Sequence, residues 1–203
     1  MLVGPKYKIC KRLGASVFEK CQTQKFQLAE ARAPRRQPRG RRGGSDFGLQ
    51  LLEKQKARFT YGLSEGQFSR YAFEAMEKKG TDSGVALLER LESRLDNVVF
   101  RAGLVKSRRA ARQLVSHGHI TVNGRRMNIP SHKVEADDTV GVQEGSRSSA
   151  LFANRAEAML GTTLPSWLEI SADGFSVTVK STPSLQPTET PFNPAVIIQF
   201  YSR

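Results

Sequence analysis

The residues with the most evident chemistry are three arginines at the start of a predicted helix. Arg108, Arg109 and Arg112 follow Ser107, a residue type that caps helices, in a segment that ends at Gly118. A guanidinium group donates hydrogen bonds in a planar array that matches phosphate oxygens. The free backbone N–H groups at a helix start also favour an anion. The spacing therefore predicts a helix whose first turn binds a phosphate backbone.

A β-hairpin is predicted directly after this helix. Ile120 and Val122 alternate with polar residues, and Asn123-Gly124 is a pair typical of a type I′ turn. Met127 and Ile129 continue the alternation on the return strand. The unit is therefore expected to be a helix-turn-helix followed by a hairpin.

This module, residues 94–133, concentrates positive charge. It contains nine Lys and Arg residues and one acid, Asp96, a net charge of +8. Asp96 is better interpreted as an ion-pair partner that orients Arg112 or a neighbour than as a catalytic acid. His117 and His119 lack a third ligand at a suitable spacing, so hydrogen bonding to backbone or phosphate is favoured over a metal site.

The chain as a whole is basic. Its 203 residues include 32 Lys and Arg against 19 Asp and Glu, a net charge of +13. This excess favours nucleic acid as the partner, ahead of an acidic membrane surface or a merely soluble basic protein. Residues 1–44 carry a net +10, whereas residues 151–203 carry a net −1. The charge is therefore localised, as on a binding surface.

The sequence predicts a cytoplasmic protein without a membrane partner. No apolar run approaches the ~20 residues of a membrane span, and the start lacks the apolar core of a signal peptide. An arginine-rich, acid-poor start is also typical of organellar transit peptides, and composition leaves that alternative open.

Three parts are expected along the chain, in an α+β fold. Residues 1–44 show little periodicity and end in a Pro, Gly and Arg mixture, which predicts a basic extended arm that orders only with RNA and neighbouring proteins. Residues 45–90 favour consecutive helices, and near the C-terminal end Asn193-Pro194 favours a helix over a strand. Residues 91–190 form the expected second domain.

Within these parts, several local patterns indicate elements. Ser45 and Ser64 are predicted helix caps. An apolar stripe over residues 83–102 predicts one long helix or two consecutive ones, without locating the break. Beyond the module, residues 144–149 are expected to be a linker, and a hairpin is expected around Asp173-Gly174.

Several stretches resemble one known family. The segment RLDNVVFRAGLVKSRRAARQLVSHGHITVNGRRMNIPSHKV resembles the RNA-binding domain named after small-subunit ribosomal protein number four. The segments GPKYKIC, SDFGLQLLEKQKARFTYGLSEGQFSRY, WLEI and FYSR resemble, in the same order, the bacterial form of that ribosomal protein family. The resemblance extends over most of the chain. It implies a helical domain over residues 45–90 that is joined by residues 191–203, and a second domain over residues 91–190 in which the module lies on an antiparallel sheet whose strands extend to about residue 180.

The resemblance implies a non-enzymatic structural constituent of the small ribosomal subunit, with no cofactor. It implies direct binding of 16S-type ribosomal RNA, nucleation of assembly of the subunit body, neighbouring small-subunit proteins as partners, and a role near the mRNA entry region and in decoding accuracy. Pseudouridine synthases and tyrosyl-tRNA synthetases carry similar domains, so an RNA-modifying enzyme is one alternative; a ribosome-rescue factor is another. Residues 45–90 and 150–203 contain no recognisable nucleotide-binding or catalytic motif, and a rescue factor would lack the helices of the first half.

The resemblance also bears on the two cysteines. Some bacterial relatives bind zinc through four cysteines in the arm. Aligning GPKYKIC and CQTQKF with them places Tyr7 and Phe26 at the first and fourth ligand positions and leaves only Cys10 and Cys21. We therefore expect no metal, two reduced thiols packed as small apolar groups, and the two aromatic rings clustered with them.

The candidate RNA-binding residues are basic or polar donors of the arm, the first helix of the helical domain and the module. They are Arg35, Arg36, Arg39, Arg41, Arg42, Lys54, Lys56, Arg58, Arg94, Arg101, Lys106, Ser107, Arg108, Arg109, Arg112, Gln113, Ser116, His117, His119, Asn123, Gly124, Arg125, Arg126 and Lys133.

Overall fold

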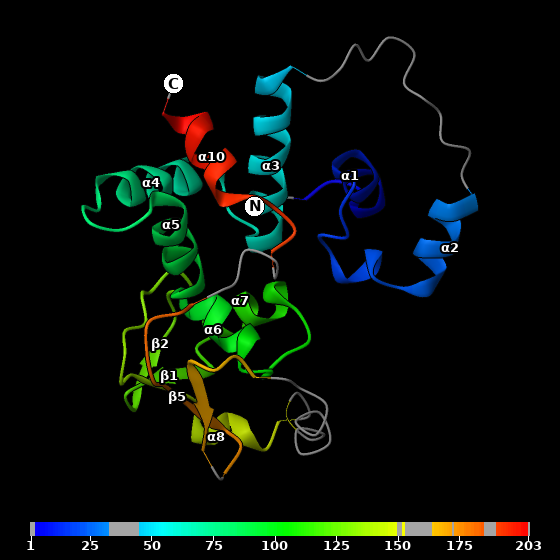
Figure 1. Cartoon of the computed structure of the whole chain (residues 1–203). Helices are drawn as coiled ribbons and strands as arrows, with labels where there is room; N and C mark the ends of the chain where they lie inside the picture. The colour runs from blue at the N-terminus through cyan, green and yellow to red at the C-terminus, as the bar shows by residue number, and fades with distance from the viewer. Residues whose placement is uncertain are drawn as a thin grey trace. The chain divides into compact units, whose positions relative to one another are not determined.

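The structure, a computed structural model, forms two compact units (Figure 1). One unit comprises residues 1–87 and 185–203, and the other comprises residues 88–184. The residues described are 3–32, 45–149, 152, 164–171, 173–184 and 190–202. Within these ranges, every helix falls short of the length and apolar character that a bilayer crossing requires.

The first unit begins with short helices, which corrects the expectation of an extended arm over residues 3–32. The elements are α1 (Lys6–Leu13), η1 (Glu19–Cys21) and α2 (Gln24–Arg32). Their buried residues Cys10, Phe18, Cys21 and Phe26 pack together, although they come from different turns of chain and show no common period. A few apolar side chains that meet across turns stabilise these helices, and a periodicity argument does not detect such a cluster.

The two cysteines are joined by a disulfide, so the expectation of free thiols is wrong. The cross-link spans 11 positions of chain between Cys10 and Cys21, and it restricts the unfolded chain of a segment that has few core residues. The expected aromatic clustering is confirmed for Phe26, which packs with the two cysteines, whereas the exposed Tyr7 ring only stacks on Phe26, with centroids 5.1 Å apart.

Among the described residues, the rest of the first unit contains four helical segments. They are α3 (Asp46–Tyr61), α4 (Glu65–Glu77), the first half of α5 (Ser83–Glu92) and α10 (Pro194–Tyr201). The predicted caps are confirmed: the hydroxyls of Ser45 and Ser64 accept hydrogen bonds from backbone N–H groups three residues later. The C-terminal helix is confirmed too, with the Asn193 side chain as its cap and Pro194 at its first position.

Helix α10 packs against α3 and α4 (Figure 1) around the half-buried carboxylate of Glu65. This group accepts hydrogen bonds from Lys54 Nζ at 2.6 Å, Arg58 Nη1 at 3.0 Å and the Tyr201 hydroxyl at 2.9 Å. Burial raises the pKa of Glu65, but the hydrogen bonds from Lys54 and Tyr201 outweigh it and leave the pKa below the ordinary value. Burial is the largest effect that raises the pKa of Tyr201, and the hydrogen bond to the Glu65 carboxylate and its negative charge raise that pKa further. One carboxylate thus joins three helices.

The second unit contains a five-stranded antiparallel sheet, and the fold class is α+β as expected. The order is β2-β1-β3-β5-β4, with β1 (Ile120–Val122), β2 (Arg125–Met127), β3 (Thr139–Val142), β4 (Leu168–Ile170) and β5 (Ser176–Val179). Asn123 and Gly124 have φ values of 50° and 76°, as the predicted type I′ turn requires. The hairpin predicted around Asp173-Gly174 is confirmed. Strand β2 ends at Met127, so the strand alternation predicted as far as Ile129 is wrong; Ile129 is exposed.

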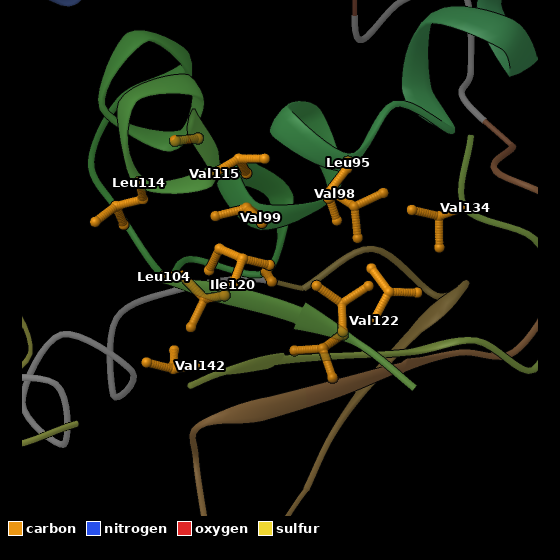
Figure 2. Packing of buried hydrophobic residues seen from close by; sticks show 14 of the residues in the cluster. Leu95, Val98, Val99, Leu104, Leu114, Val115, Ile120, Val122, Val134 and Val142 are labelled. Atoms are coloured by element: carbon orange, nitrogen blue, oxygen red, sulfur yellow. The ribbon is translucent and has the colours of Figure 1, made fainter. Parts of the chain in front are cut away.

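Two helices, α6 (Leu95–Arg101) and α7 (Arg108–Ser116), pack on one face of this sheet. Figure 2 shows Val98, Val99 and Val115 of these helices facing Ile120 and Val122 of β1. These apolar contacts with β1 fix which face of α7 points outward.

The segment 144–149, expected to be a linker, instead contains one helical turn, α8 (Glu144–Arg147), in which Ser146 is buried.

The break that the sequence did not locate lies at Ser93-Arg94, between α5 and α6. Arg94 is extended and forms an isolated bridge with Lys133. The N–H of Leu95 donates to the carbonyl of His132 at 2.9 Å, and that of Asp96 donates to the carbonyl of Pro130 at 3.1 Å. Carbonyl groups of the chain after the hairpin thus accept hydrogen bonds from N–H groups that would bond within the helix if α5 and α6 were continuous.

Candidate nucleic-acid interface

The outer face of α7 presents polar donors to solvent. Ala111, Leu114 and Val115 are buried, whereas Arg109, Gln113 and Ser116 are exposed and recur at a spacing of four and three on the opposite face. The helix begins as predicted, because the Ser107 hydroxyl accepts a hydrogen bond from the N–H of Ala110 at 3.1 Å. Lys106 is exposed just before this cap.

Two of the predicted arginines are held by the buried carboxylate of Asp96. Arg94 Nε and Nη2 donate to it at 3.0 Å and 2.9 Å, and Arg112 Nε and Nη2 donate at 2.8 Å and 2.6 Å. The predicted pairing of Asp96 with Arg112 is confirmed. Arg94 is 2% exposed, so its side chain supports the module from within and does not form its surface.

A second buried carboxylate, Glu92, holds two further arginines. Arg101 Nε donates to Glu92 Oε2 at 2.8 Å, and Arg101 Nη2 donates to Oε1 at 3.1 Å. Arg108 Nη2 lies 3.9 Å from Glu92 Oε1, and Arg108 Nε donates to Asn97 Oδ1 at 2.8 Å. The side chains of Arg101 and Arg108 remain 21% exposed, so their outer edges reach the surface.

The hairpin is attached to the end of α7 through Arg126. Its Nε donates to the carbonyl of Gly118 at 3.0 Å, and its Nη2 donates to the carbonyl of His117 at 3.1 Å. A β-carbon at Gly118 would collide with this guanidinium, and Gly118 has a φ of 74°. The glycine therefore permits a close approach that sets the hairpin against the helix.

The remaining polar candidates of the hairpin fix loops and also reach solvent. Asn123 Nδ2 donates to Asp138 at 2.7 Å, and its Oδ1 accepts from the N–H of Thr139 at 2.8 Å. His119 Nδ1 is 2.9 Å from the Ser146 hydroxyl. Gly124 and Arg125 are exposed at the turn.

Lys133, by contrast, carries an exposed ion pair. Its Nζ donates to Glu135 at 3.1 Å, and both side chains are more than half exposed. Water screens such a pair strongly, so Lys133 remains available to another anion.

Candidates outside the module are placed differently. Lys54 and Arg58 of α3 bind Glu65, and Lys56 donates to Glu53 at 2.6 Å. Lys54 is 6% exposed and is therefore part of the helix packing. The five arginines expected to bind RNA in the arm lie outside the described residues. They are Arg35, Arg36, Arg39, Arg41 and Arg42.

The exposed candidates brought together in the second unit come from α7, the segment before it and the hairpin. They are Lys106, Arg109, Gln113, Ser116, His117, Asn123, Gly124, Arg125, Arg126 and Lys133. Glu92 and Asn97 were missed as organising residues; Glu92 precedes the segment whose charge was counted, and only its burial reveals its role. Among the described residues, no group of three or more potential ligands is arranged for a metal ion.

Comparison with known proteins gives two domain matches. Residues 93–140 match the S4 domain, and residues 1–92 match the ribosomal protein S4/S9 N-terminal domain. Small ribosomal subunit protein uS4 of Acetivibrio thermocellus is 44% identical over 98% of each chain. The uS4 protein of Thermus thermophilus is 42% identical over 99% of this chain and 98% of its own. That of Corynebacterium kroppenstedtii is 47% identical over 78% of this chain and 79% of its own.

Proposed function

The chain belongs to the family of small ribosomal subunit protein uS4, and we propose that it binds the 16S-type RNA of that subunit directly, as a structural constituent. One observation carries the proposal for the second unit. Among the described residues of the second unit, Lys106, Arg109, Arg125 and Arg126 are exposed on α7, the segment before it and the hairpin, whereas the less exposed arginines of the module are paired with Asp96 or Glu92. A surface of this kind offers phosphate oxygens several donors in fixed positions.

Recognition then proceeds through the RNA backbone. The bases of an A-form helix are hidden in a deep, narrow groove, so a rigid basic surface reads the shape of a folded RNA and its 2′-hydroxyl groups. Arg109, Arg125 and Lys106 supply charge, and Gln113 and Ser116 supply neutral donors between them. The start of α7, which Ser107 caps, adds the positive end of the helix dipole next to the exposed Lys106 and Arg109.

Salt dependence of binding tests this function. The ligand is a folded small-subunit rRNA fragment. If the chain neutralises about six of its phosphates, a plot of log affinity against log salt concentration has a slope of about −4 to −5. Replacing Lys106, Arg109 and Arg125 with alanine is expected to reduce the slope by about 3, one for each lost phosphate contact. A slope near zero for the unmodified chain contradicts the proposal.

A matched variant separates these contacts from general charge. Arg70, Lys78 and Lys79 are exposed residues of α4 and the turn after it. Their replacement by alanine removes the same formal charge and is expected to leave the slope nearly unchanged. An equal reduction in both triple variants would show that only the net charge of the chain matters.

We further propose that the chain nucleates assembly of the subunit body, lies near the mRNA entry region beside neighbouring small-subunit proteins, and supports decoding accuracy in the cytoplasm. The match over residues 1–92 supports this assignment over a rescue factor, and the relatives' names support a structural role over an enzymatic one. Reconstitution of small subunits with and without the chain tests the assembly role: omission should leave the body incompletely assembled, and normal assembly without it refutes this part.

A further inference from the structure

Glu92 is a fully buried carboxylate with no direct access to RNA. It is 0% exposed at the end of α5, and its Oε2 accepts hydrogen bonds from Asn97 Nδ2 at 2.7 Å and Arg101 Nε at 2.8 Å. Its Oε1 accepts from Arg101 Nη2 at 3.1 Å. An ionised group in such a place requires its partners, because burial without them is strongly unfavourable.

A short series of contacts leads from this carboxylate to the start of α7. Asn97, whose amide is fixed by Glu92, accepts the Nε–H of Arg108 on its Oδ1 at 2.8 Å. The Arg108 guanidinium also lies 4.4 Å from the centroid of the Phe100 ring. One carboxylate therefore sets the orientation of two arginines that are each partly exposed, Arg101 and Arg108.

A buried anion close to an RNA-binding surface has two opposite effects. Its charge repels phosphate and lowers the affinity for any polyanion. Its hydrogen bonds hold arginine side chains that would otherwise lose rotamer freedom on binding, and this favours a ligand whose phosphates match the held arrangement. The first effect acts on all RNA, whereas the second acts only on RNA of the right shape.

We propose that Glu92 is a positioning residue for RNA selectivity: it fixes Arg101 directly and Arg108 through Asn97, in an arrangement that fits a folded rRNA, at the expense of affinity for RNA in general. The inference rests on the proposed RNA-binding function and assigns its selectivity to a residue outside the binding surface.

The test compares two RNA probes on the full chain. One probe is a folded small-subunit rRNA fragment, and the other is a generic RNA duplex of equal length. Glu92→Gln keeps the side-chain shape and is expected to weaken binding of the folded fragment about tenfold, the loss of one charge-assisted contact. Binding of the duplex is expected to stay unchanged or to tighten. Glu169→Gln is the control, because Glu169 is an exposed residue of β4 and the charge change is the same.

Each outcome decides the proposal. A fall in the ratio of the two affinities in Glu92→Gln but not in Glu169→Gln supports it. Equal tightening for both probes means that Glu92 acts only as a charge, and this overturns it. If the wild-type chain shows no preference for the folded fragment, the proposed function itself fails, whatever Glu92 does.

A second variant covers the case in which Glu92→Gln does not fold, as judged by circular dichroism and the fluorescence of buried Trp167. Arg108→Lys keeps the positive charge but not the planar group that Asn97 and Phe100 hold. The same loss of selectivity is expected. An unchanged affinity ratio in Arg108→Lys overturns the proposal.

Discussion

The contact of Arg126 with Gly118 makes a quantitative prediction for Gly118→Ala. Gly118 has a φ of 74°, and an added β-carbon would lie 2.7 Å from Arg126 Cζ and closer still to Nε. Alanine can therefore be accommodated only if the guanidinium leaves the carbonyl groups of His117 and Gly118, to which it donates two hydrogen bonds.

Two terms contribute to the cost. A left-handed backbone conformation costs alanine about 1–2 kcal/mol. Loss of the two hydrogen bonds from the exposed Arg126 side chain adds about 1 kcal/mol, since water replaces much of their energy. Gly118→Ala is therefore expected to lower the free energy of unfolding by about 2–3 kcal/mol in the wild type, but by only about 1–2 kcal/mol when Arg126 is already alanine.

Urea unfolding of the full chain, followed by tryptophan fluorescence, measures these values. Trp167 is the only tryptophan in the sequence and is buried in the core of the second unit, so its signal reports that unit. Gly124→Ala provides the control, because Gly124 has a φ of 76° with nothing within 4 Å of an added β-carbon. Equal costs of Gly118→Ala with and without Arg126 would refute the reasoning.

Three further predictions concern other parts of the fold. Ser107→Ala removes the cap of α7 and should destabilise the second unit by about 1 kcal/mol in the Trp167 assay; no change would mean that the cap is redundant. The pKa of Glu65 is lowered from 4.5 on folding, so its stabilisation is present above that pH and is lost as pH falls through the folded value; urea midpoints from helical circular dichroism between pH 7 and 3 should fall less in Glu65→Gln. Because Cys10 and Cys21 are joined, the oxidised chain should react with iodoacetamide only after reduction; alkylation of both thiols before reduction would contradict the disulfide.

The elements around the candidate interface could be predicted because their signals are local. Ser107 precedes a run with a helical apolar face, and Asn123-Gly124 separates two alternating segments. Both patterns are complete within about ten residues, the range over which turn and cap chemistry acts. The start of α7 and the hairpin turn therefore agree with expectation.

The contacts that organise the interface could not be predicted in the same way. The break at Arg94 depends on carbonyl groups of residues 130–132, and the role of Glu92 depends on packing that brings it to Arg108. Counting charges treated the arginines of the module as equivalent, whereas burial divides them into Arg94, which supports the interior, and exposed residues such as Arg109. Tertiary packing makes that distinction, and spacing along the chain does not contain it.

The docking of α10 on α3 and α4 has a consequence for the order of events during synthesis. Residues 88–184 leave the translating ribosome before α10 does, although α10 completes the unit that begins upstream of them. The second unit therefore has all of its strands while the first still lacks the helix that carries Tyr201 to Glu65. Domains generally fold as units as they emerge, so the hairpin-bearing unit is expected to mature first. Phe68, which is fully buried in the complete fold, lacks its contact with Tyr201 until α10 emerges, and for that interval its ring is more accessible to chaperones.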